Sequence, residues 1–533
     1  ELAPLLYCAE ERHFVRVALA SFASIGLIVA LVLLTTHIQI AYFLFGGVGL
    51  YAIYRSVQIW RGGATESEGG ERPTRALAPA GLRFALFLGA SIAGAAGAGV
   101  QFLPAADYVT EYSRRVQTTR EAAGETGREW SSSWSIHPEE AMSQLIPEFA
   151  GNNVGSAPWV EGTYWGRNPF KDNHEYVSLV VLLLAGISFF GAAGRGVRFT
   201  LLGIGGVALL YTLGTHTPVW RIFYEVVPGI SLFRAPSIAA FLFGFGAITL
   251  MAFGVDRVLG ICAPPSGSRA NPSLESGEDP GEDPSGAVEK DRTGGPSRES
   301  ERKLFLFLLS ATGVLFLGTL LAAGGGLTSF WTSVFYSGIE PGKMEALGRA
   351  QPFVARGFLI ATALAGGILG LTWASLKKGL SPTLLVLGFG LLLVADQIRV
   401  DDPFIQTANF QQWSVPDANI QFLQGQLRTQ EPFRVLSFGG RVGAGQDVKP
   451  GMYGLELAAG HHPNDLARYR ELIGMVGSGW PQNLVNTETG RIDTGLLSIL
   501  NIRYVLWPVY QLGAFPLGEA VAATSMDGQN AYE

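Results

Sequence analysis

The stretch 104–175 holds most of the side chains in this sequence that could carry out chemistry. A carboxylate within hydrogen-bond reach of a hydroxyl group can take its proton during a transfer reaction. The stretch offers four such carboxylates as candidates, and the sequence does not single out one of them as a catalytic base. They are Glu139, Glu161, Asp172 and Glu175.

Aromatic residues are interleaved with polar ones through the same stretch. Aromatic faces stack on sugar rings, while carboxylates and amides bind sugar hydroxyls. The pattern predicts a pocket for a sugar, an acceptor or a polar headgroup, lined by Trp134, His137, Tyr164, Trp165 and Asn168. The alternative is an interfacial belt, since Trp and Tyr gather at the headgroup level of membrane proteins.

Three arginines could bind a phosphate group. Arg234 stands in Phe233–Pro236, just before an apolar stretch, and Arg114 and Arg115 follow an earlier one. A guanidinium at a lipid–water boundary can make paired hydrogen bonds to a phosphate. The alternative for Arg234 is a snorkelling or ion-paired arginine.

Several kinds of site lack a sequence signal. The paired His461 and His462 have no third ligand at a suitable spacing, so no metal site is assigned, and a divalent ion stays an open alternative. The chain has two cysteines, Cys8 and Cys262, which cannot form a zinc motif. No glycine-rich phosphate loop is present, so we expect an activated substrate or a gradient to supply the energy.

The composition indicates that lipid surrounds much of the chain. Of 533 residues, 48% are hydrophobic and 15% are charged, against roughly 25% charged in soluble domains. A span needs roughly 20 mostly apolar residues. The sequence predicts nine transmembrane helices: Phe14–Leu34, Ile38–Tyr54, Phe84–Leu103, Tyr176–Phe190, Phe199–Leu213, Ile238–Val255, Leu304–Ala323, Phe358–Leu376 and Leu380–Ala395.

The basic residues predict the orientation. If the nine spans alternate, the arginine- and lysine-rich loops after spans two, four, six and eight fall on one side, which the positive-inside rule makes cytoplasmic. The start of the chain is then inside. The loop 104–175 and the tail are extracytoplasmic. We expect the cytoplasmic loop 263–301 to be disordered, because it is rich in Pro, Gly, Ser, Glu and Asp.

Residues 403–533 have the composition of a soluble domain. Within it Phe433–Phe438 and Ile502–Trp507 read as strands, and Asn464–Met475 and Thr494–Leu500 as helices. The predicted organisation is a transmembrane helical domain over 1–402 and a small α/β domain over 403–533. Because the sequence opens on Glu1 and ends abruptly, we expect it to be a fragment that lacks its N-terminal helices, with a truncated tail domain.

The order of short motifs resembles the YfhO-like bacterial membrane proteins, of the C-type (GT-C) glycosyltransferase superfamily. The matching motifs run along nearly the whole chain: His37–Gln39, Gln101–Pro104, Ser113–Arg115, Pro147–Gly151, Tyr164–Gly166, Glu175–Tyr176, Leu213–Gly214, Thr217–Pro218, Pro228–Pro236, Met452–Gly454, His462–Pro463, Arg468–Tyr469 and Leu500–Tyr504.

The resemblance implies a multi-pass enzyme of the bacterial cell membrane. Such an enzyme would take a sugar from a polyprenyl-phosphate carrier and transfer it to a cell-envelope acceptor on the outer face. Members usually carry a catalytic carboxylate in the first outer loop, but the first outer turn here, Thr35–Ile38, has no acid. The alternatives are a transporter or flippase for a lipid-linked saccharide, and a non-catalytic envelope protein that binds glycans.

Overall fold

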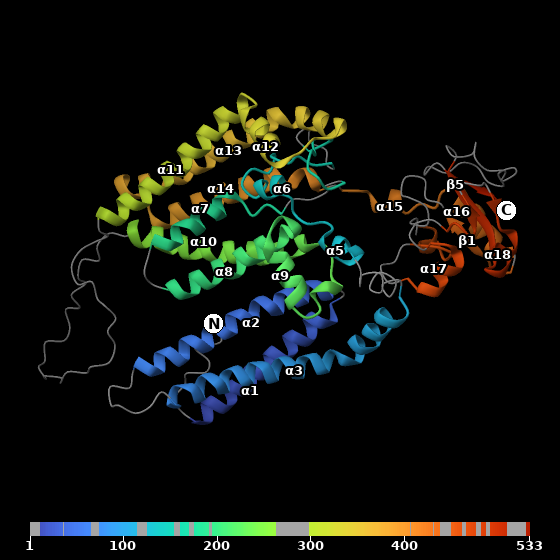
Figure 1. The fold of residues 1–533 in the computed structure, drawn as a ribbon, viewed down its shortest axis with the longest axis horizontal. Helices are drawn as coiled ribbons and strands as arrows, with labels where there is room; N and C mark the ends of the chain where they lie inside the picture. The colour runs from blue at the N-terminus through green and yellow to red at the C-terminus, as the bar shows by residue number, and fades with distance from the viewer. Residues whose placement is uncertain are drawn as a thin grey trace, which may run out of the picture. The chain divides into compact units, whose positions relative to one another are not determined.

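The computed structural model describes residues 11–35, 37–65, 74–113, 125–153, 160–169, 175–190, 194–262, 298–405, 407–429, 431–437, 449–460, 465–475, 481–486, 491–508 and 529–532. The chain divides into two compact units (Figure 1). The helical unit comprises residues 1–94 and 129–406, and the tail unit comprises residues 95–128 and 407–533. We predicted a boundary between 402 and 403, whereas the tail unit comprises 407–533 together with the second part of one long helix.

Seven helices of the described chain are long and apolar enough to cross a membrane. The chain is therefore a mostly helical, multi-pass membrane protein, as predicted from its composition. These helices are α1 (Glu11–Leu34), α2 (Ile38–Thr65), α3 (Thr74–Glu111), α10 (Ala240–Cys262), α11 (Arg298–Ala323), α13 (Pro341–Lys378) and α14 (Pro382–Asp401).

The two remaining predicted spans are not among the seven, so the predicted count of nine is not confirmed within the described residues. The nine residues of α7 (Leu179–Ile187) continue into the three residues of η2 (Ser188–Phe190). Together they extend about 18 Å, less than the roughly 30 Å of a bilayer core. The 18-residue α8 (Arg195–Thr212), with two arginines in its first turn, is not among the seven.

Helix α7 lies in the centre of the helical unit and is buried on nearly all sides. It packs against α10, while α8 lies along the other side of α10 (Figure 1). Close approach depends on glycine, because the α-carbon of Gly254 in α10 lies against the Leu184 carbonyl in α7. Small residues let helix backbones approach in this way. Helix α7 takes the chain into the helical unit from one end, and α8 returns it to the same end. The pair therefore leaves the alternating direction of the seven longer helices unchanged.

Replacing Gly254 by Ala should destabilise the helical unit. An added Cβ would lie 1.8 Å from the Leu184 carbonyl oxygen, and overpacking of this kind costs about 1–3 kcal/mol. Gly260 in the same helix is the matched control, because a Cβ there meets nothing within 4 Å. Thermal unfolding in detergent should show a lower Tm for Gly254→Ala and an unchanged or higher one for Gly260→Ala. Equal Tm values for the two variants would contradict this packing.

Short helices and loops join the long helices at one end of the helical unit. These are α5 (Glu125–Ser132), α6 (Pro138–Met142), η3 (Gly214–His216), α9 (Pro218–Val226), η4 (Ile230–Leu232), η5 (Pro236–Ala239), α12 (Gly326–Phe335) and η6 (Asp402–Phe404). The C-terminal end of α8 reaches this layer, since the Ile136 amide donates to the Thr212 carbonyl at 2.8 Å. We call it the loop layer, and it contains the stretch that the sequence marks for chemistry.

The tail unit is built on a four-stranded sheet in the order β2-β1-β5-β6 (Figure 1). Strand β1 pairs in parallel with β2 and β5, and β5 pairs antiparallel with β6. Alternate residues face opposite sides. Val435 and Tyr504 pack with α16, and Leu436 and Trp507 pack with α17 and α18. The elements are α15 (Phe410–Trp413), α16 (Ala418–Thr429), β1 (Arg434–Ser437), η7 (Lys449–Tyr453), β2 (Glu456–Leu457), α17 (Ala467–Ile473), β3 (Val485–Asn486), β4 (Arg491–Ile492), α18 (Thr494–Ile499), β5 (Ile502–Pro508) and β6 (Gln529–Tyr532).

Candidate functional site

A polar cluster in the loop layer begins at the N-terminus of α6. Pro138 occupies the first helical position, where its missing N–H costs nothing. Three residues after His137, the Glu140 Oε2 atom accepts the His137 backbone N–H at 2.8 Å. This return contact fixes the chain as it enters the helix and directs Glu139 and Glu140 inward, where both are buried.

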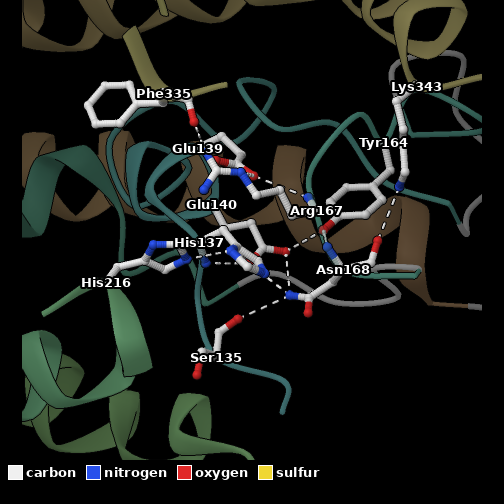
Figure 2. Close-up of polar contacts among 10 residues, drawn as sticks. All are labelled: Ser135, His137, Glu139, Glu140, Tyr164, Arg167, Asn168, His216, Phe335 and Lys343. Carbon is white, nitrogen blue, oxygen red and sulfur yellow. Dashed lines mark hydrogen bonds and ion pairs between the residues drawn. The ribbon is translucent and has the colours of Figure 1, made fainter. Parts of the chain in front are cut away.

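Glu140 is the structural centre of the cluster (Figure 2). The Tyr164 hydroxyl donates to Glu140 Oε1 at 2.8 Å. The Asn168 amide contacts both carboxylate oxygens, at 3.2 and 3.0 Å. Burial, followed by the negative charge of Glu140, raises the pKa of Tyr164, so the phenol stays a donor. Since both oxygens of Glu140 accept hydrogen bonds, its role is to hold the loops together.

Glu139 has a different environment, because its two oxygens differ in their contacts. Its side chain is fully buried. Oε1 accepts the Arg167 backbone N–H at 3.1 Å, and the Arg167 Nε atom lies 3.7 Å from it. Oε2 makes no hydrogen bond of regular geometry with the described residues, but the Tyr336 hydroxyl is close to this carboxylate. Burial, then the charge of Glu139 and a side-chain hydrogen bond with it, raise the pKa of Tyr336. A bound hydroxyl that displaced Tyr336 would be placed to give its proton to Glu139.

Two basic side chains cover this pair of carboxylates (Figure 2). Arg167 lies over the Tyr336 ring at 4.3 Å and donates to the Phe335 carbonyl at 2.5 Å. Lys343, from the first turn of α13, donates to the Asn168 carbonyl at 3.1 Å, and its ammonium is 4.2 Å from the centre of the Tyr164 ring. Because Arg167 and Lys343 are partly exposed, the cluster has a positively charged approach to a negatively charged interior.

His137 and His216 connect α6 to η3 through a hydrogen bond of 2.7 Å between Nδ1 and Nε2 (Figure 2). Sequence reasoning missed His216, which is 79 residues away. Burial lowers the pKa of His216, and the charges of His137 and Arg167 act in the same direction, against a smaller opposite effect of Glu139 and Glu140.

The lowered pKa of His216 predicts a stability that falls in acid. The unfolded chain takes up a proton at His216 at a higher pH than the folded protein, so stability is fully present above the ordinary pKa of about 6.5 and is lost below it. Between pH 7.5 and 5.5 the Tm of the wild type should fall, and it should fall less in His216→Gln. The control variant is His37→Gln, because His37 is exposed. An identical fall in wild type and His216→Gln would remove this histidine as the cause.

The predicted aromatic ligands take different places. Trp165 is fully buried in the core beside Phe149, and its indole N–H donates to the Phe149 carbonyl at 2.7 Å. Tyr164 is almost fully buried as well. Neither ring offers an open face for sugar stacking, because their faces pack against protein. Trp134 is half-buried and holds a left-handed backbone, with φ of 61°.

Arg234 lies in a segment whose backbone is held firmly while its side chain is exposed. The Phe233 carbonyl accepts from the Ser131 hydroxyl at 2.8 Å, and the Arg234 carbonyl accepts from the Gln39 amide at 2.5 Å. The Ala235 N–H donates to the Ser133 carbonyl at 3.0 Å, with Ala235 itself in the left-handed region at φ 55°. The segment that carries Arg234 is therefore hydrogen-bonded to the loop that precedes His137, Glu139 and Glu140.

Two of the other candidate acids belong to the described residues. Glu161 is exposed, and Glu175 is half-buried shortly before α7. Asp172, Arg114, Arg115 and the pair His461–His462 lie outside the described residues, as does most of the loop 263–301. Within the described ranges, no group of three His, Cys, Asp or Glu residues could hold a metal ion.

A second buried network fastens the loop layer to α13 and α14, and the sequence did not indicate it. The Glu148 side chain is fully buried, with Oε1 2.5 Å from Arg399 Nη1 and 3.5 Å from Arg356 Nη2. Arg399 Nη2 also contacts Asp396 at 3.1 Å. The Tyr176 hydroxyl donates to the same aspartate at 2.7 Å, and burial and Asp396 raise the Tyr176 pKa. This network fixes the position of the loop that follows the Glu139 cluster in the chain.

No protein-family model, curated protein or solved structure matches this chain. The resemblance to YfhO-like proteins therefore stays a prediction from the motifs, and the function is argued from the residues of the loop layer.

Proposed function

We propose that the chain is a membrane glycosyltransferase of the bacterial cell membrane. It would transfer a sugar from a polyprenyl-phosphate carrier to a cell-envelope acceptor on the extracytoplasmic face. The motif order supports the reaction class. The observation that carries the proposal is that one loop layer holds a buried carboxylate, Glu139, and an exposed arginine, Arg234, on segments joined by hydrogen bonds.

The reaction assigns a separate task to each of these two residues. The acceptor hydroxyl attacks the anomeric carbon of the sugar, forming the new glycosidic bond as the bond from that carbon to the phosphate oxygen breaks. The Glu139 carboxylate takes the hydroxyl proton. The Arg234 guanidinium holds the phosphate and stabilises the charge that grows on it, so polyprenyl phosphate leaves as the second product. No nucleotide is required, because the lipid phosphate already activates the sugar.

The distribution of basic residues supports an extracytoplasmic loop layer. Arg195 begins α8, Arg257 is near the end of α10, and Lys377 and Lys378 end α13. All these positions are at the helix ends opposite the loop layer. Lysine and arginine concentrate on the cytoplasmic side of membrane proteins. On this basis the loop layer, with Glu139 and Arg234, faces away from the cytoplasm.

Replacing Arg234 by Gln should weaken use of the lipid-phosphate donor without loss of fold. A charged hydrogen bond to phosphate is worth about 1.5–3 kcal/mol, so kcat/KM for the donor should fall about 10–100-fold. Purified protein in vesicles, given labelled polyprenyl-phosphate sugar and an envelope acceptor, would provide the measurement. Arg221 on α9 is the matched control, since it is another exposed arginine of the same layer. The assignment is wrong if Arg234→Gln and Arg221→Gln turn over the donor equally well.

A further inference from the structure

The helix ends opposite the loop layer hold a second concentration of charge, around the start of α8. Arg195 and Arg198 stand in the first turn of α8. Gly194, which precedes the helix, lies against the Phe253 ring of α10. Residues four apart share a helix face, so Arg257 extends from the same face as Phe253. The packing of α8 on α10 thus places three arginines from two helices at one membrane boundary.

Two hydrogen bonds at this end go to neutral oxygens. Arg198 is buried and donates to the Ser188 carbonyl, and Arg257 donates to the Ser300 hydroxyl at 3.4 Å. Both Arg195 and Arg257 repel the charge of Arg198. Two nearby carboxylates on α11 already have partners, since Glu299 pairs with Lys303 at 2.7 Å and Glu301 with Lys377 at 3.7 Å. The exposed Asp256, beside Arg257 on α10, adds one negative charge. Three arginines against this one carboxylate leave the local charge positive, which favours an anion.

Further donors point to the same place. The first backbone N–H groups of an α-helix have no partner within the helix, and its N-terminus carries partial positive charge. The Tyr54 hydroxyl of α2 packs against the α-carbon of Gly196 in the first turn of α8. This hydroxyl and the Arg257 Nε atom are both buried and have no hydrogen-bond partner among the described residues. A phosphate oxygen would satisfy donors of this kind.

The surface beside the arginines is apolar and runs along the helix. Arg195, Phe199 and Leu202 are spaced by four and three residues, so they form one stripe on α8. Phe199 is 55% exposed and Leu202 is 47% exposed. Gly206 continues the stripe with open space above it. A positively charged end followed by an exposed apolar stripe is complementary to an anionic phospholipid. Its headgroup would lie at Arg195 and an acyl chain would lie along the helix.

We propose that the start of α8, with Arg195, Arg257 and Tyr54, binds the phosphate group of an anionic membrane lipid in the leaflet opposite the loop layer. The site is independent of the proposed transferase reaction, because the 18 residues of α8 separate the two by about 27 Å. Its basis is charge and hydrogen-bond complementarity to phosphate together with the continuous apolar stripe.

The test is thermal unfolding of delipidated protein in detergent with added phosphatidylglycerol or phosphatidylcholine at equal mole fraction. Phosphatidylglycerol should raise the Tm of the wild type by several degrees more than phosphatidylcholine. The double variant Arg195→Gln/Arg257→Gln should lose this difference. Arg302→Gln should keep it, because Arg302 is an exposed arginine on α11 at the same membrane end.

Two further measurements distinguish binding of a lipid from binding of a free anion. Inorganic phosphate alone should give no comparable rise in Tm, and Phe199→Asn should reduce the effect of phosphatidylglycerol by removing the acyl contact. An equal rise with inorganic phosphate would identify a soluble-anion site and overturn the lipid assignment. Equal stabilisation by both lipids, or an equal loss in Arg302→Gln, would overturn the site itself.

Discussion

Replacing Arg399 by Met should lower the free energy of unfolding by about 3 kcal/mol. The arginine joins Glu148 and Asp396, whose side chains are both fully buried. Removing one partner of a buried ion pair costs about 3–5 kcal/mol, because an unpaired charge stays behind. We expect the lower end of this range, since Arg356 remains 3.5 Å from Glu148. Unfolding in mixed detergent micelles provides the measurement.

Two further variants make this expectation specific. Arg349 pairs with Glu345 in an exposed ion pair, so Arg349→Met should cost less than about 1 kcal/mol. Adding Asp396→Asn to Arg399→Met should recover part of the lost stability, because Arg399 is the ion-pair partner of Asp396 in the described chain and the second change removes the charge left unpaired. If Arg399→Met and Arg349→Met unfold alike, the buried network does not stabilise the helical unit.

Replacing Glu139 by Gln should abolish most of the proposed sugar transfer. A positioned general base contributes about 100- to 10,000-fold to a rate, and an amide cannot take the acceptor proton. The amide oxygen can still accept the Arg167 backbone N–H, so the fold should persist and donor binding through Arg234 should change little. We therefore expect kcat to fall at least about 100-fold with a nearly constant KM, measured as release of labelled polyprenyl phosphate.

The exposed Glu161 supplies the matched control for Glu139. Glu161→Gln should transfer sugar at the wild-type rate, since its carboxylate lies apart from the cluster. Wild-type kcat in a folded Glu139→Gln variant would exclude Glu139 as the base and would direct attention to Glu175.

The sequence predicted long single helices well and short buried ones poorly. Runs of 16 to 21 mostly apolar residues need no tertiary information, so the seven long helices were recognisable from the sequence alone. The limits of α7 depend on Ser178, whose backbone φ of 81° and side-chain hydroxyl start the helix late. Because α7 is buried on nearly every side, it has no polar face to reveal its extent. In the tail, the short apolar run at Val435 and Leu436 made β1 predictable, and the two residues pack into cores on opposite faces of the sheet.

The site was only half predictable for a similar reason. Aromatic and acidic residues marked the stretch, and Pro138 with Glu140 three residues after His137 was a local signal for a helix start that went unused. Contacts between distant segments carry no such signal. His216 pairs with a residue 79 positions away, and Glu148 meets Arg399 across 251 positions. Only the folded structure shows that Trp165 lies in the core, whereas the sequence had placed it in the lining of a sugar or acceptor pocket.

The central claim is most directly tested by following a labelled sugar on polyprenyl phosphate in vesicles that contain the purified protein and an envelope acceptor. The proposal predicts a covalent glycosylated acceptor and one polyprenyl phosphate released for each sugar transferred, with neither formed by Glu139→Gln. Movement of the intact labelled lipid across the bilayer without any glycosylated product would contradict a transferase and identify a flippase instead.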